Sequence, residues 1–190
     1  LLMEQACGFL DPMKLRSCYA ESKRMGETMC VAWAHQYNLH TNIVRPFHTY
    51  GPGMLLNDGR VFSDFVADVV AERDIFLKSD GLAQRAFCYI ADATIGFLTV
   101  LLKGDKAEVY NVGNPDAETS IRELAQIIAN IFPERGTRLQ FKIPENNNSY
   151  LPSATLRASP CIDKVKNLGW YPVIDLQNGF RRTIESFLIR

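Results

Sequence analysis

A tyrosine and a lysine lie four residues apart, at Tyr19 and Lys23, within a stretch of helical character. Residues four apart on a helix share a face, so both side chains are expected to point into the same space. A phenol has an unperturbed pKa of about 10, and a neighbouring ammonium group lowers that pKa because it favours the phenolate. The pair could therefore take a proton from an alcohol, or return one. A half-buried tyrosine beside a solvated lysine is the plainer interpretation of the same spacing.

The elements next to this pair must position it. Asp11 and Pro12 are helix-start signals, and they predict a helix from that point to about Tyr37. The apolar, β-branched segment 41–47 is typical of a strand. Its strand ends at a glycine- and proline-containing segment, 48–59, which is predicted to be a loop.

The rest of the chain alternates between helical and strand-like segments with short connections. Ser120 and Glu123 have the spacing of a capping box, which predicts a helix start at that point. Such alternation is typical of an α/β protein. The expected helices are 61–73, 92–104, 119–132, 159–169 and 175–189, the expected strands are 74–79, 85–90, 108–113 and 138–143, and 144–154 is expected to be a polar loop.

The composition excludes several classes of function. Lys+Arg and Asp+Glu number 21 each, so the formal net charge is zero, and we expect no nucleic-acid partner. No apolar run approaches the roughly 18 residues of a membrane span. The five cysteines are scattered and form no C-x-x-C pair, which indicates reduced thiols in a cytoplasmic protein and neither a disulfide framework nor a metal site.

Several segments, in chain order, resemble the motifs of one superfamily. "CYAESKRMGET" (18–28) resembles the Y-x-x-x-K helix of the extended, nucleotide-sugar-modifying branch of the short-chain dehydrogenase/reductases. "RPFHTYGPGM" (45–54) resembles its R-x-F-N-x-Y-G-P loop, and "QRAFCYIADA" (84–93) resembles its R-x-F-x-Y-V-x-D strand. The segments 110–125 and 168–187 resemble its Y-N-x-G and L-G-W-x-P motifs. The chain thus resembles the NAD-dependent nucleotide-sugar epimerase/dehydratase family. Within it, the motifs look closest to UDP-glucuronate decarboxylases, followed by UDP-glucose 4-epimerases and dTDP-glucose 4,6-dehydratases.

The resemblance implies a role for the pair. Tyr19 would be the proton-transfer base, and Lys23 would lower its pKa and hold the nicotinamide ribose of NAD. Pro46 would also contact the cofactor.

The resemblance further implies a nucleotide-sugar site. Arg85 and Arg157 would bind the substrate pyrophosphate, since guanidinium donors suit phosphate oxygens. Arg60 and Val61 would lie beside the nucleotide base. His48 stands where most relatives have the asparagine that contacts the nucleotide sugar, and histidine changes both the shape and the charge available there. For Arg85 a surface position, and for Val61 a core position at a helix start, are the plainer alternatives.

Part of the expected machinery does not occur in this sequence. No G-x-x-G-x-x-G lies within the 190 residues, although the family uses that turn to hold the dinucleotide pyrophosphate. The sequence therefore predicts the C-terminal portion of a Rossmann-like fold. Residues 1–53 would be the remainder of the NAD-binding domain, and 54–190 would be mainly a nucleotide-sugar-binding subdomain with a strand and helix returning to the Rossmann sheet. Exposed apolar faces favour a homodimer or higher oligomer. The resemblance implies the same, since in the family the helix with the tyrosine commonly packs in a dimer interface.

Three functions follow as hypotheses. The first is a fragment of an NAD-dependent decarboxylase or 4,6-dehydratase that acts on a UDP- or dTDP-linked sugar through a 4-keto intermediate, inactive as this chain alone. The second is a nucleotide-sugar 4-epimerase. A third, of another class, is a non-catalytic nucleotide-sugar-binding or assembly module, and a plain α/β scaffold is the blandest alternative.

Overall fold

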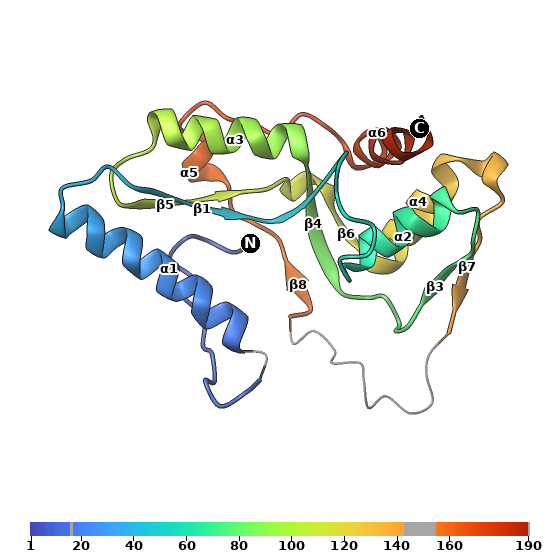
Figure 1. Cartoon of the computed structure of the whole chain (residues 1–190), viewed down its shortest axis with the longest axis horizontal. Helices are drawn as coiled ribbons and strands as arrows, with labels where there is room; N and C mark the ends of the chain where they lie inside the picture. The colour runs from blue at the N-terminus through green and yellow to red at the C-terminus, as the bar shows by residue number, and fades with distance from the viewer. Residues whose placement is uncertain (16, 143–154, 190) are drawn as a thin grey trace.

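The computed structural model describes residues 1–15, 17–142 and 155–189, and it has the α/β architecture that the alternating pattern predicts (Figure 1). Helices and strands follow one another along almost the whole chain. In order, the elements are α1 Ser17–Gln36, β1 Asn42–Pro46, β2 His48–Tyr50, α2 Val61–Val70, β3 Ile75–Leu77, β4 Gln84–Tyr89, α3 Ile90–Lys103, β5 Glu108–Val112, a 3₁₀ turn Pro115–Ala117, β6 Glu118–Ser120, α4 Ile121–Ile131, a 3₁₀ turn Pro133–Arg135, β7 Leu139–Phe141, β8 Arg157–Ala158, α5 Asp163–Lys166 and α6 Leu176–Leu188.

The strands pair mainly in parallel. β1 pairs with β5, so that Arg45 lies opposite Asn111. β4 is the centre of a second sheet, in which β2 and β8 run parallel to it and β6 runs antiparallel. β3 and β7 form a third, parallel pair. Parallel pairs join strands that are distant in sequence, which is the arrangement of an α/β fold.

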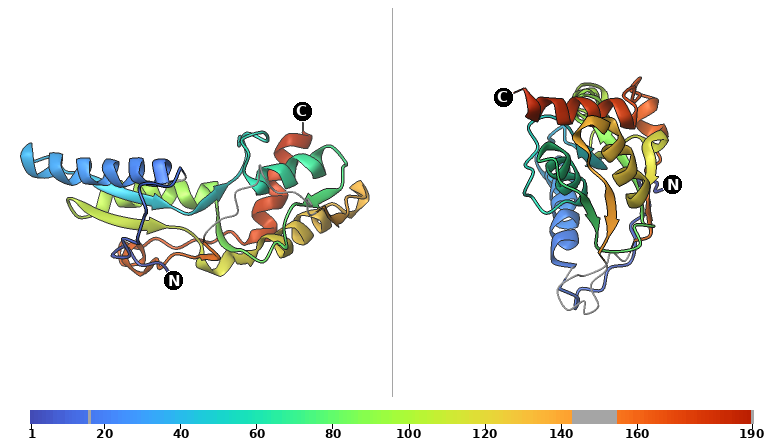
Figure 2. Two further views of the ribbon diagram at one scale, coloured as in Figure 1. Left: turned by 90° about the horizontal axis from the view of Figure 1, so that it is seen from below. Right: turned by 90° about the vertical axis from the view of Figure 1, so that its right-hand side faces the viewer.

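The helices divide the molecule into two ends. At one end α1 and α3 lie on opposite sides of the β1–β5 pair, and α5 packs against β5 (Figure 1). At the other end α2, α4 and α6 pack against one another beside β3 and β7. Figure 2 shows that these ends lie at opposite extremes of an elongated molecule.

Each end has its own hydrophobic core. The larger core fills the α2–α4–α6 end, where the Tyr50 and Phe180 rings stack with centroids 3.9 Å apart. The smaller core lies between α3, β5 and α5 and includes Tyr110 and Trp170. By contrast, α1 buries only Ser17 and Ala34 among its described residues. The helix that carries the tyrosine–lysine pair is therefore held by few apolar contacts.

Most of the predicted elements are confirmed, and their boundaries are corrected. The helix predicted from Asp11 begins at Ser17, because Asp11 instead forms a turn in which its carboxylate accepts a hydrogen bond from the Met13 amide and its carbonyl accepts one from the Ser17 hydroxyl. The capping box of Ser120 and Glu123 is confirmed. The predicted loop 48–59 contains β2, and the predicted helix 159–169 is reduced to α5. The polar loop 144–154 lies outside the described residues.

Asp92 illustrates why one boundary differs. The predicted helix 92–104 would begin at Asp92, but α3 begins two residues earlier, at Ile90, and Asp92 is buried in its first turn. One of its carboxylate oxygens accepts hydrogen bonds from the amides of Val173 and Ile174, at 3.1 and 2.9 Å. Asp92 thus ties the segment before α6 to α3.

No helix in the described part of the chain is long and apolar enough to cross a membrane. The division into 1–53 and 54–190 stays a prediction.

Candidate functional site

One stripe of α1 faces a cavity of about 860 Å³. The stripe consists of Ala20, Lys23, Arg24, Glu27 and Thr28, whose spacing of three and four residues places them on one face of the helix. The opposite walls come from the N-terminal segment and from the end of β1 with the residues after it. These walls include Cys7, Arg45, Pro46, His48 and Arg60. We call this space the first cavity.

The tyrosine–lysine pair sits at the edge of the first cavity. Lys23 Nζ lies 5.4 Å from the centroid of the Tyr19 ring, so the two side chains are neighbours as the four-residue spacing predicts. Lys23 lines the cavity, whereas Tyr19 is 72% exposed and lies outside the lining residues. The helix therefore presents the ammonium group to the cavity and the phenol to its rim.

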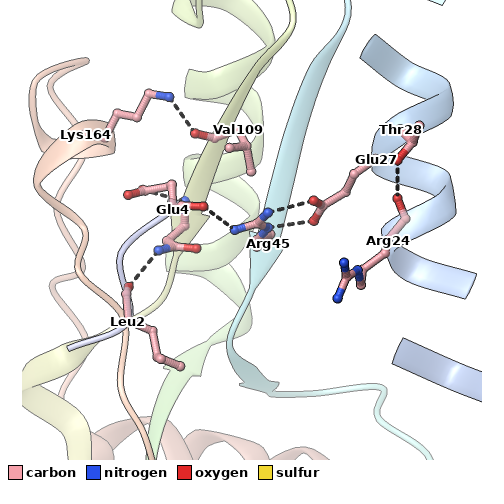
Figure 3. Close-up of polar contacts among 9 residues, drawn as sticks. Leu2, Glu4, Arg24, Glu27, Thr28, Arg45, Val109 and Lys164 are labelled. Carbon is pink, nitrogen blue, oxygen red and sulfur yellow. Dashed lines mark hydrogen bonds and ion pairs between the residues drawn. The ribbon is translucent and has the colours of Figure 1, made fainter. Parts of the chain in front are cut away.

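A bidentate ion pair fastens α1 to the sheet (Figure 3). Arg45 of β1 donates from Nε and Nη2 to the two carboxylate oxygens of Glu27, at 2.6 and 2.7 Å. Its Nη1 donates to the backbone oxygen of Glu4 at 2.8 Å, and the Glu4 carboxylate accepts a bond from the Asn111 amide. The hydrogen bonds from Arg45 hold the pKa of Glu27 below its usual value, so this carboxylate stays ionised near neutral pH. Lys23 is one turn away from this junction.

Sequence reasoning assigned no role to Glu27 or Arg45. A signal was present, because Glu27 is four residues after Lys23 and so shares its helix face. The partner, however, comes from a strand 18 residues away, and only the fold brings the two together.

A second cavity of about 850 Å³ lies between α2, β3 and β4. Val61, Arg85 and Phe87 line it, together with the acidic Asp64 and Asp68 of α2 and the basic Arg73 and Lys78, which flank β3. His48 and Arg60 line both cavities, and they therefore form the wall between them. The predicted substrate residues His48, Arg60, Val61 and Arg85 thus converge in the structure.

His48 is held in a largely dry position. Its ring lies 5.6 Å from that of Phe87, and its Nδ1 is buried without a hydrogen-bond partner among the described residues. Burial, together with the positive charges of Arg85 and Arg60, lowers the pKa of His48 to about 4. The imidazole on the wall is therefore neutral near pH 7.

Arg60 is fixed by contacts on several sides. Its Nε donates to the Asp58 carboxylate at 2.6 Å, and its Nη1 donates to the Thr49 carbonyl at 3.3 Å. The guanidinium carbon lies 4.8 Å from the Phe62 ring centroid. The hydrogen bond from Arg60 lowers the pKa of Asp58, which keeps the pair ionised.

The two arginines predicted to bind pyrophosphate do not converge. Arg85 is buried in β4 and donates to the carbonyls of Gln84, Thr155 and Leu156, at 2.6, 2.8 and 3.4 Å. In the β4–β8 pair, Arg157 lies opposite Gln84, so it points to the other sheet face from Arg85.

Arg157 has a partner on that other face. It donates to both carboxylate oxygens of Glu118, at 2.5 and 2.8 Å, and lines neither cavity. Its substrate-binding role stays a prediction that would require this pair to open.

Over residues 7–113 the sequence matches the model of the NAD dependent epimerase/dehydratase family. The chain belongs to this family. That span contains β1, β4 and α1, together with Tyr19, Lys23, His48 and Arg85, and so covers nearly all of the candidate site.

Relatives within the family agree with the motifs. The chain is 34% identical over 188 residues to UDP-glucuronic acid decarboxylase 5 of Arabidopsis thaliana, covering 98% of this chain and 52% of that protein. It is 35% identical over 185 residues to UDP-glucuronic acid decarboxylase 1 of Danio rerio, covering 97% and 42%. The chain therefore spans about half the length of the curated relatives it matches.

Solved structures agree on the fold. UDP-glucose 4-epimerase of Thermotoga maritima, solved with UDP-glucose, superimposes with a TM-score of 0.78 at 24% identity, over 90% of this chain and 53% of that one. The Bordetella bronchiseptica enzyme WbmF in complex with NADH gives a TM-score of 0.77 at 26% identity, over 95% and 55%. These matches confirm the prediction of a Rossmann-like epimerase/dehydratase fold.

Proposed function

We propose that this chain carries the proton-transfer pair and the sugar-nucleotide site of an NAD-dependent enzyme that modifies a nucleotide sugar through a 4-keto intermediate. The observation that supports this most directly is the shared wall. His48 and Arg60 separate a cavity lined by Lys23 from a cavity lined by Arg85. A single elongated ligand could place its reacting sugar beside the pair and its nucleotide diphosphate beside the arginines.

In this proposal the pair transfers the proton of the sugar C4 hydroxyl. Tyr19 accepts it, and Lys23 stabilises the phenolate that makes Tyr19 a base. NAD, when bound, supplies the acceptor for the hydride that leaves the same carbon. Lys23 and Pro46 line the first cavity, and they would hold the nicotinamide end there. The rim position of Tyr19 means that its ring must turn inward to reach a bound sugar.

The second cavity would hold the nucleotide diphosphate. Arg85 and Arg60 supply guanidinium donors, and Val61 at the start of α2 supplies apolar surface beside the base. Arg157 would take part only after leaving Glu118.

Oxidation at C4 gives a 4-keto intermediate that can react further in three ways. A 4-keto group labilises a C5 carboxylate, acidifies C5 for loss of water, or is reduced again on the other face. We place decarboxylation or dehydration first because the decarboxylases share the motifs, and 4-epimerisation second. We place the whole enzyme in the cytoplasm, as a homodimer or higher oligomer, in keeping with five free cysteines.

The binding module of the other class is favoured by one observation. Tyr19 is largely exposed, whereas His48, Arg60 and Arg85 line cavities.

An activity assay separates the enzyme from the binding module. If the enzyme hypothesis holds, this chain joined to a polypeptide that supplies the Gly-rich dinucleotide-binding half should convert a UDP-sugar to product, and Tyr19→Phe should abolish that turnover. Ligand binding without any product would support the binding module instead.

The 190-residue chain can be tested directly by calorimetric titration. We expect UDP-glucose to bind and Arg85→Ala to weaken that binding by about tenfold or more, because a charge-assisted phosphate contact is lost. Arg138→Ala, outside both cavities, is the control. We expect no NAD turnover by this chain alone, because its sequence has no Gly-rich turn, and measurable turnover would contradict that expectation.

A further inference from the structure

Two side chains of α1 are placed to engage the ammonium group of Lys23. The positions three and four residues from Lys23 hold Tyr19, Ala20, Gly26 and Glu27, and Glu27 is the one acid among them. Residues at these spacings are neighbours on a helix, and a lysine and a glutamate four apart can form an ion pair. Tyr19 and Glu27, one turn before and one turn after, therefore compete for the same ammonium group.

In the structure the ammonium group lies with Tyr19. Lys23 Nζ is 5.4 Å from the Tyr19 ring centroid, and no carboxylate of the described residues forms an ion pair with Lys23. Glu27 instead directs both carboxylate oxygens to Arg45, which donates from Nε at 2.6 Å and from Nη2 at 2.7 Å. Because Glu27 stays ionised, its charge would attract Lys23 if Arg45 released it.

Arg45 is also held from the side opposite α1, and Figure 3 shows it between Glu27 and Glu4. Its Nη1 donates to the Glu4 carbonyl at 2.8 Å. Glu4 is buried, and its carboxylate accepts the Asn111 amide at 3.0 Å. The Asn111 side chain donates in turn to two backbone carbonyls, at 3.0 and 3.2 Å. The guanidinium group is thus anchored on the sheet by contacts that do not involve α1.

We propose that Arg45 is a positioning residue for the proton-transfer pair. By taking both carboxylate oxygens of Glu27, Arg45 leaves the ammonium group of Lys23 beside the tyrosine. The proposal rests on the proposed function, because it concerns how the ammonium group of that pair is placed. Arg45→Lys would keep the charge but lose the planar fork of donors that matches two carboxylate oxygens.

A mechanical tie is the plainer role for the pair of Arg45 and Glu27. Among its described residues α1 buries only Ser17 and Ala34, so any contact with β1 helps to hold the helix. Under that role, a change of either partner would loosen α1 in the same way. Under the positioning role, only a change that frees the carboxylate moves Lys23.

Nuclear magnetic resonance of the 190-residue chain separates the two roles through the Overhauser contact between the Lys23 side chain and the Tyr19 ring. We expect Arg45→Lys to weaken this contact about twofold, the size of an exposed ion-pair effect, and to produce a contact between Lys23 and Glu27. Glu27→Gln breaks the same tie but leaves no carboxylate, so the contact should stay as in wild type. No weakening in Arg45→Lys, or as much weakening in Glu27→Gln, would overturn the proposal.

Arg24→Lys is the matched control. It makes the same charge-conserving change next to Lys23, but Arg24 approaches Glu21 only at 3.8 Å. Glu21 is two residues from Lys23 and does not share its helix face, so its release should leave Lys23 in place. If Arg45→Lys does not fold, wild type still provides a test. Glu27 must titrate below 4.5 while Arg45 holds it, and a pKa of 4.5 or above would overturn the proposal.

The chain joined to a Gly-rich dinucleotide-binding half gives a second measurement, the pH dependence of kcat/KM. In Arg45→Lys the rising limb, where the base ionises, should move to higher pH by about 0.5, because the ammonium group favours the phenolate less. An unmoved limb would contradict the proposal. If the joined wild-type enzyme makes no product, the proposed function fails, whereas the contacts in the 190-residue chain still decide whether Arg45 places Lys23.

Discussion

The two ends of the molecule hold the residues around their cavities in place by different kinds of interaction. Around the second cavity, α2, α4 and α6 share a large apolar core, and the wall residues project from elements that this core supports. Around the first cavity, α1 buries few side chains and is fastened by the polar contacts of Arg45 with Glu27 and Glu4. Apolar packing fixes one side of the site, whereas one charged junction fixes the other.

The largest expected effect lies in the apolar end. Phe180→Ala should lower the free energy of unfolding by about 4 kcal/mol, since the ring is fully buried and stacks on Tyr50. Urea denaturation followed by circular dichroism measures this. Leu102→Ala, at a position 79% exposed, is the control and should change stability by less than about 0.5 kcal/mol. A small loss for Phe180→Ala would show that this core is not what holds the second cavity.

His48 lies between the two ends, and it should make stability depend on pH. Its folded pKa of about 4 is below the unfolded value of 6.5, so above pH 6.5 the residue is neutral in both states and contributes no difference. As the pH falls from 6.5 to about 4, the unfolded chain takes up a proton that the folded chain refuses, and up to about 3 kcal/mol of stability is lost.

Stability measured against pH for wild type and His48→Asn isolates this contribution, because acidic groups common to both chains cancel. The wild-type curve should fall more steeply between pH 6.5 and 4. Parallel curves would mean that His48 titrates normally and is not enclosed as the structure describes. Titration of the His48 imidazole resonances gives the same answer independently.

An intermediate effect is expected at the polar end. Glu27→Gln removes a partly buried, bidentate ion pair and should cost about 1–2 kcal/mol. Hydrogen exchange should accelerate along α1 but stay unchanged in α2 and α4, because those helices have a separate core. Equal acceleration in both regions would remove the contrast between the ends. Glu21→Gln, which alters only a loose exposed pair on the same helix, is the control.

The smallest effect concerns one helix start. Ser120→Ala removes the hydroxyl that accepts the Glu123 amide at 3.1 Å and should cost about 1 kcal/mol. Thermal denaturation detects a change of this size. Ser120→Asp retains a capping oxygen and should recover most of the loss, whereas a loss as large as that of Ser120→Ala would argue against the cap.

Elements that depend on residues close together in the sequence could be predicted. Elements and contacts that depend on pairing between distant segments could not. The capping box marks α4 because both of its residues lie within one turn. β2 escaped prediction because its three residues have no apolar alternation, and only pairing with β4 makes them a strand. The same distinction holds in the site. The Tyr19–Lys23 contact follows from helix spacing, whereas the shared wall of His48 and Arg60 depends on how a strand and a loop return to one place.

The pairing of β4 with β8 also decides which position of β8 shares a sheet face with Arg85. Ala158 lies directly opposite Arg85 and lines the first cavity, while Arg157 is turned to the far side of the sheet. Sliding β8 by one position would exchange the faces of its two residues, but it would also take Arg157 away from its partner Glu118. An engineer who wants a second guanidinium group on the sheet face of Arg85 should therefore redesign position 158 and leave Arg157 bound to Glu118.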